Sequence, residues 1–194
     1  MNKMKFTSLA VLAAALLSAC VTTPTPQNAE EHRKVIAQGV YGAEFETFVA
    51  KRPYKATAAL IKAKVSECLS AKVDHQACRK SGFMSSSCNE YSDTYLPTVI
   101  AGPQRTELHV QFKREGSGAG ELHIGGQPNA GGRYVVVADF TTADNGKATK
   151  VEIYGNNVER SIPRAIRHWV NGTNLGCPDF KPELVIPGMG KSTK

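Results

Sequence analysis

The sequence lacks an apolar run long enough to cross a bilayer as a helix. Its longest such run, from Phe6 to Leu17, falls short of the roughly 20 residues that a membrane span requires. The sequence also lacks a dense block of basic residues, although the chain carries 24 Lys and Arg against 17 Asp and Glu. The first absence excludes a transmembrane helix, and the second favours a charge that serves solubility.

The cysteines lack the close spacing that metal and redox sites need. No C-x-x-C pair occurs among Cys20, Cys68, Cys78, Cys88 and Cys177, whereas zinc sites and catalytic dithiols typically carry such pairs. We therefore expect no metal and no cofactor.

The N-terminal segment is what the chain does have. Lys3 and Lys5 form a basic head, an apolar run follows, and the segment ends in Leu17-Ser18-Ala19-Cys20. This is the anatomy of a secretory signal, and its ending resembles the lipobox of bacterial lipoproteins. The resemblance implies that the Cys20 thiol receives a diacylglyceryl group, that residues 1–19 are removed, and that the new amino group is acylated, with palmitate for example. The alternative is an ordinary signal peptide that leaves Cys20 as an unpaired thiol.

Three acyl chains on one cysteine would anchor the protein permanently, because a single chain holds only reversibly. In the proteobacterial members of this family an Asp after the cysteine signals retention in the inner membrane, and here that residue is Val21. The resemblance therefore implies an outer-membrane lipoprotein on the periplasmic face, a compartment without nucleic acid. Removal of residues 1–19 leaves 22 basic and 17 acidic residues, a net charge of +5 that suits anionic envelope components or solubility alone.

The other four cysteines predict two disulfides, because an even number in an oxidising compartment is typical of a stapled domain. Three pairings are possible. We favour Cys78–Cys88, which closes a loop, and Cys68–Cys177, which ties the ends of the domain together. The second should stabilise the fold by about 4–5 kcal/mol, since it closes a long loop.

The chain divides into a signal peptide (1–19), a lipidated tether (20–40), a single periplasmic domain (41–180) and an irregular tail (181–194). The tether is polar and proline-containing, with room for a short helix near Glu30 to Gln38. Within the domain, apolar periodicity predicts helices over 54–69 and 162–170 and an irregular segment over 71–89. Strands are expected over 41–50, 93–100, 105–114, 121–125 and 133–142, with one more after a hairpin at Asn145-Gly146. The hairpin would place Phe140 opposite Val151 and Ala138 opposite Ile153.

This order, β-α-β5-α, predicts a two-layer α+β fold, an antiparallel meander with two helices packed on one face. Ser161 is the expected N-cap of the second helix. The polar side of that helix carries Arg160, Arg164 and Arg167 beside His168, which suggests either docking to an acidic partner or a solvated face.

Residues that carry chemistry elsewhere are few. His109 and His123 are expected on the polar faces of neighbouring strands, without the further ligands that a metal site needs. Glu44 and Glu46 share one face of a strand. Since no nucleophile and base occur together, we expect a non-enzymatic accessory or structural subunit of an envelope complex. A lipoprotein that binds a small lipid or cell-wall fragment, in a cavity lined by residues such as Val135, Val137 or Leu122, is the alternative.

Overall fold

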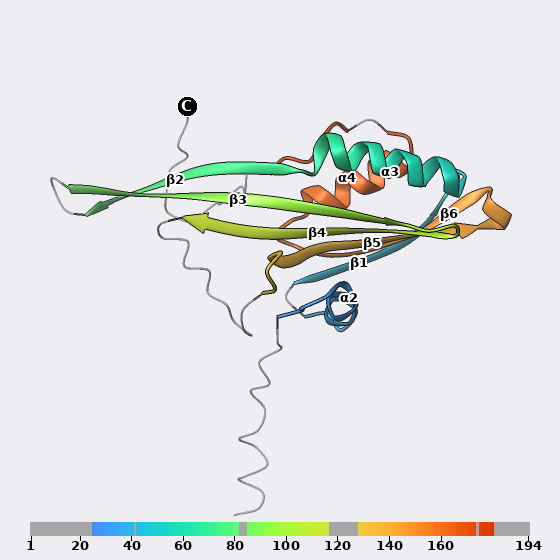
Figure 1. The fold of residues 1–194 in the computed structure, drawn as a ribbon, viewed down its shortest axis with the longest axis horizontal. Coiled ribbons are helices and arrows are strands. Elements are labelled where there is room, and N and C mark those ends of the chain that lie inside the picture. Colours follow the sequence, from blue (N-terminus) through green and yellow to red (C-terminus); the bar gives the residue numbers. More distant parts are fainter. Residues whose placement is uncertain (1–24, 41, 82–84, 117–127, 174, 181–194) are drawn as a thin grey trace, which may run out of the picture.

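The computed structural model describes residues 25–40, 42–81, 85–116, 128–173 and 175–180. Six antiparallel strands form one sheet in the order β1-β6-β5-β4-β3-β2. Helices α3 and α4 cover one face of this sheet, and helix α2 lies against the other (Figure 1). The elements are α2 (Ala29–Ala37), β1 (Ala43–Ala50), α3 (Tyr54–Cys68), β2 (Ala71–Ser81), β3 (Ser85–Ala101), β4 (Arg105–Gly116), β5 (Arg133–Ala143), β6 (Ala148–Asn156) and α4 (Ser161–Val170). The predicted α+β fold, with two helices on one face of an antiparallel sheet, is confirmed.

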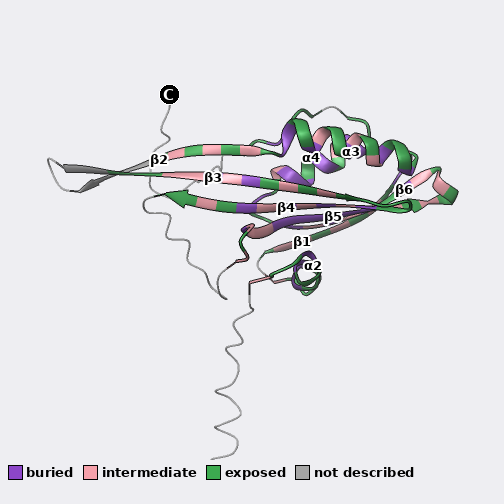
Figure 2. Ribbon diagram, in the orientation of Figure 1, coloured by how far each residue is buried: buried purple, intermediate pink, exposed green. Residues whose placement is uncertain are grey.

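The main core fills the space between the sheet and helices α3 and α4. Val136, Ala138 and Phe140 alternate along β5 and are fully buried, as are Ile61 of α3 and Ile166 of α4 (Figure 2). Each large apolar side chain buried here stabilises the fold by about 1.5–3 kcal/mol. This core fixes the position of both helices over the sheet.

The β5–β6 hairpin has the predicted register. Phe140 pairs with Val151 and Ala138 with Ile153. In the turn, Asn145 and Gly146 have φ values of 51° and 86°, and the Lys147 N–H donates to the Asp144 carbonyl at 3.0 Å. Positive φ at both central residues is the requirement of a type I′ turn, which explains why Asn-Gly occurs here.

The expectation of an irregular segment over 71–89 is wrong. Residues 71–81 form β2 and pair with the first part of β3 from Ala71↔Tyr95 to Ser81↔Ser85. The two strands run on beyond the end of helices α3 and α4 (Figure 1). The segment is poor in large apolar residues because only part of it covers the core. Pro97 of β3 lies past the last residue that β2 pairs, so its missing N–H removes no hydrogen bond between β2 and β3.

Helix α2 lies within the segment that was expected to form the tether. The short helix expected near Glu30 to Gln38 is present as α2, but it packs onto the domain, with Ile36 only 3 % exposed, so this part of the chain is not a free tether. Asn28 caps it, since its side chain accepts from the Glu31 N–H at 2.9 Å.

The expected N-cap of the last helix is wrong. Ser161 is the first residue of α4, and Arg160 occupies the N-cap position without a side-chain cap.

Candidate functional site

Arg160, Arg164 and Arg167, called here the arginine stripe of α4, lie on the side of that helix that faces β1. Arg160 Nε is 2.8 Å from a carboxylate oxygen of Glu44, and an Arg167 Nη is 2.6 Å from one of Glu46. The stripe and the acidic strand face, which the sequence showed as separate features, are therefore two sides of one charged seam. Two of its three arginines, Arg160 and Arg167, are therefore paired within the chain. Because each pair is partly exposed, its contribution to the free energy of folding is small.

Arg164 is the exception in this stripe. It is exposed and has no ion-pair partner in the part of the chain that the structure describes. It shares with both ion pairs a hollow of about 300 Å³ between β1 and α4. His168, next to the stripe, is engaged elsewhere, because its Nδ1 lies 2.7 Å from the Thr173 hydroxyl.

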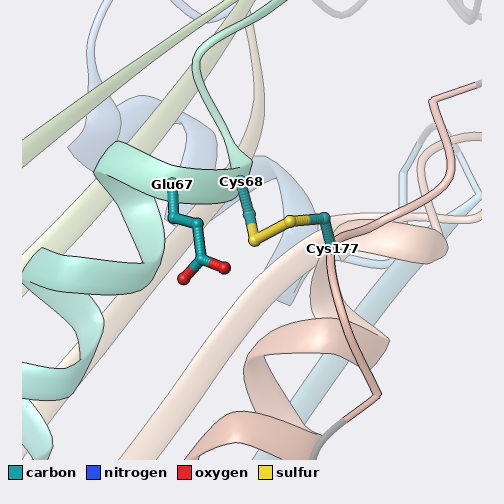
Figure 3. Close-up of side chains that lie close together, drawn as sticks. All are labelled: Glu67, Cys68 and Cys177. Atoms are coloured by element: carbon teal, nitrogen blue, oxygen red, sulfur yellow. A yellow bond between two sulfur atoms is a disulfide. The ribbon is translucent and has the colours of Figure 1, made fainter.

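The structure contains the Cys68–Cys177 disulfide that the sequence favoured, across 109 residues of chain. It fastens the end of α3 to the segment that follows α4 (Figure 3). The Glu67 carboxylate lies beside it, and the three residues are near enough to share an ion. The sulfurs are bonded to each other, however, and Glu67 accepts from Lys64 Nζ at 2.8 Å. This group therefore fastens the fold and has no thiolate to offer a metal.

The second predicted disulfide involves the β2–β3 hairpin. Cys88 is disulfide-bonded, and the register places Cys78 directly opposite it. The side chain of Cys78 falls outside the described residues, so the Cys78–Cys88 pairing stays a prediction, now supported by the register. Cys20 also lies outside the described part of the chain.

A charged network that joins residues of α2, β4 and β5 lies under helix α2. Arg33 donates to Asp139 from Nε at 2.9 Å and from an Nη at 2.7 Å, and the same Nη contacts Glu107. Arg105 adds a contact of 3.1 Å to Asp139, and His109 Nε2 lies 3.0 Å from Glu107. Burial alone would raise the pKa of Glu107, but the bonds from Arg33 and His109 lower it below its ordinary value.

The network accounts for His109, one of the two histidines expected on the polar face. Its imidazole is directed to a carboxylate, and His123 lies outside the described residues. What the sequence could have shown is the alternation of Arg105, Glu107 and His109 along one face of β4. No comparable pattern pointed to Arg33, because residues 20–40 were expected to form the tether.

A second polar cluster lies on the opposite face of the sheet, beyond the cover of α3 and α4. Arg114 binds the buried Asp93 through two bonds of 2.6 and 2.8 Å, and His75 Nε2 lies 3.1 Å from the same carboxylate. Nearby, the Tyr95 hydroxyl donates to Glu159 at 3.1 Å. Burial raises the pKa of Glu159 above its ordinary value, even though the Tyr95 bond and the Arg133 charge lower it.

These contacts join carboxylates to an arginine or to hydroxyl groups and fasten neighbouring parts of the chain to one another. Ser92, the hydroxyl residue beside Asp93, donates to Asp74 at 2.6 Å. The arrangement around His75 is therefore structural: Arg114 holds the Asp93 carboxylate through two bonds, and the imidazole lies next to the same carboxylate.

Comparison with protein-family models, with curated proteins and with solved structures finds no match. Among the described residues, no helix is long and apolar enough to cross a membrane.

Proposed function

We propose that the protein is a non-enzymatic outer-membrane lipoprotein, anchored through a lipid on Cys20, whose periplasmic domain is an accessory or structural subunit of an envelope complex. The observation that carries the proposal is the sequence Leu17-Ser18-Ala19-Cys20 after a basic head and an apolar run. That pattern supports processing at Cys20, and Val21 supports sorting to the outer membrane.

The position of α2 supports a domain held close to the membrane. Asn28, the N-cap of α2, follows Cys20 by eight residues. Even at full extension, a chain of eight residues spans no more than about 29 Å. The anchored domain would therefore be held closer to the bilayer than a twenty-residue tether would hold it.

The alternative, a carrier of a lipid or cell-wall fragment, has less support. Val135 and Val137, two of the residues expected to line its cavity, are fully buried, and Leu122 lies outside the described residues. A ligand between sheet and helices would have to displace a core that is already filled with side chains.

Cell fractionation tests the anchor. Wild-type protein is expected in the outer membrane, Cys20→Ala in the soluble or unprocessed fraction, and Val21→Asp in the inner membrane. Ser18→Ala is the matched control, since it keeps a small residue in the signal and should leave sorting unchanged. Mature Cys20→Ala that stays with the outer membrane would contradict the proposal.

A further inference from the structure

Strand β1 is the outermost strand of the sheet on its side. It pairs with β6 from Ala43↔Asn156 to Ala50↔Thr149, and no strand in the described part of the chain pairs with its other edge. An open edge presents backbone N–H and C=O groups that another strand can bind. Proteins usually protect such an edge with charge, proline or a bulge.

The side of β1 that faces α2 carries no such protection. The alternate residues Phe45, Thr47 and Val49 are all exposed, and Phe45 and Val49 retain 48 % and 61 % of their accessible surface. Phe45 rests its ring against Tyr154, at 4.9 Å between centroids, and still leaves about half its surface open. Apolar side chains at alternate positions on an open edge are suited to the alternate side chains of an added strand.

The other side of β1 borders a basic hollow. Its volume is about 300 Å³, and α4 forms its opposite wall. Three guanidinium groups meet two carboxylates here, since Glu44 and Glu46 each bind one arginine and Arg164 has no ion-pair partner among the described residues.

We infer that β1 and α4 together bind an extended acidic segment of another protein, which adds to the sheet as a further strand. Its backbone would bond to the free edge of β1, and its alternate side chains would fall on the two sides just described. On one side they would be apolar, against Phe45 and Val49. On the other a carboxylate would reach Arg164, which can bind it through a charge-assisted bond.

A second copy of this chain fits the edge less well. Its β1 offers Glu44 and Glu46, but both are already paired, and an antiparallel copy would add its own Arg164 on the same side of the joined sheet. The excess positive charge would double, whereas an acidic segment neutralises it. The inference rests on the proposed role as a subunit that binds a partner, but not on the lipid anchor.

The test uses the protein as isolated from cells in mild detergent and two fluorescent peptides of about ten residues, long enough to span an eight-residue strand. One peptide alternates valine with glutamate and the other alternates valine with lysine. Fluorescence anisotropy should show the acidic peptide binding about ten-fold or more tightly than the basic one at low salt. The acidic peptide with N-methyl groups on alternate residues should lose binding, because it cannot complete the backbone ladder.

Arg164→Glu should weaken the acidic peptide by about ten-fold or more. Lys62→Glu, the same change of charge on an exposed position of α3, is the matched control and should have little effect. Circular dichroism of both variants shows whether they fold.

The inference is overturned if the two peptides bind equally, if neither binds at about 1 mM, or if Arg164→Glu and Lys62→Glu weaken binding alike in folded protein. It is also overturned if the N-methylated peptide binds as well as its parent. A dimer in sedimentation that Val49→Lys dissociates would assign the edge to a second copy instead. None of these results depends on where Cys20 places the protein, so failure here is separate from failure of the anchor.

Discussion

Arg33 of helix α2 holds Asp139 of strand β5 through two hydrogen bonds of 2.9 and 2.7 Å. The carboxylate is almost completely buried, with 5 % of its side chain exposed, and the guanidinium is 17 % exposed. This pair locks α2, the first described helix after the proposed lipid site, onto an interior strand of the sheet.

Arg33→Ala should lower the free energy of unfolding by about 2–3 kcal/mol, because it leaves a buried carboxylate with one partner fewer. The loss stays at the low end for a buried pair because Arg105 still contacts Asp139. Lys34→Ala is the control on the same helix: Lys34 pairs with Glu30 in full solvent, so little change is expected. Urea denaturation measures the free energy of unfolding of both variants. Equal losses in the two would show that the Arg33–Asp139 pair stabilises the domain no more than an exposed pair does.

The Cys68–Cys177 disulfide should dominate the stability of the domain. Cys68→Ala and Cys177→Ala should each lose about 4–5 kcal/mol, since either change releases a loop of 109 residues in sequence separation. The double variant should lose little more than either single one. If the double variant is far less stable than both, the two cysteines act independently and the disulfide is not the cause. Peptide mapping without reduction should also recover Cys78 linked to Cys88.

His32 should make the domain sensitive to mild acid. The residue is 3 % exposed, and burial lowers its pKa from 6.5 to about 4. The unfolded chain therefore binds more protons between these values, so stability falls as the pH falls from about 6.5 to 4, by about 3 kcal/mol in total.

Urea denaturation across that range should give a steeper decline for wild type than for His32→Gln. The glutamine amide can still donate to the Tyr154 carbonyl, which His32 Nε2 approaches at 3.2 Å, but it does not titrate. Parallel curves for the two proteins would remove His32 as the cause.

Glu159 should act in the opposite direction. Its pKa is raised by burial, so the native state holds the proton more tightly, and this contribution to stability is lost as the pH rises through the native pKa. Glu159→Gln should therefore gain stability relative to wild type as the pH rises above about 4.5, the ordinary pKa. A difference that stays constant with pH would show that Glu159 has no perturbed titration.

The sequence predicted those parts of the fold in which local chemistry and pattern agree. Asn145-Gly146 permits positive φ at both positions, and the apolar residues on either side agree with the register that this turn sets. Strand β2 has a weaker pattern. Ala71, Val73 and His75 do alternate with exposed residues, and Cys78 and Cys88 lie at mirror positions about the turn, but the segment lacks large apolar residues.

The candidate site depended on contacts between distant residues. Arg167 and Glu46 are 121 positions apart, and Arg33 and Asp139 are 106 apart. Periodicity shows which side of its own element a residue occupies, but it does not show which element packs against that side. The arginine stripe was therefore recognised as a charged face, whereas its neutralisation by β1 and the exception of Arg164 required the tertiary arrangement.

The most direct test of the lipoprotein account is the intact mass of the protein purified from the outer membrane, with its N-terminal peptide mapped. We predict that the chain begins at Cys20 and that this residue carries a diacylglyceryl group on its sulfur and an acyl chain on its amino group. A mature chain that begins elsewhere, or an unmodified Cys20 in membrane-bound protein, would contradict the account.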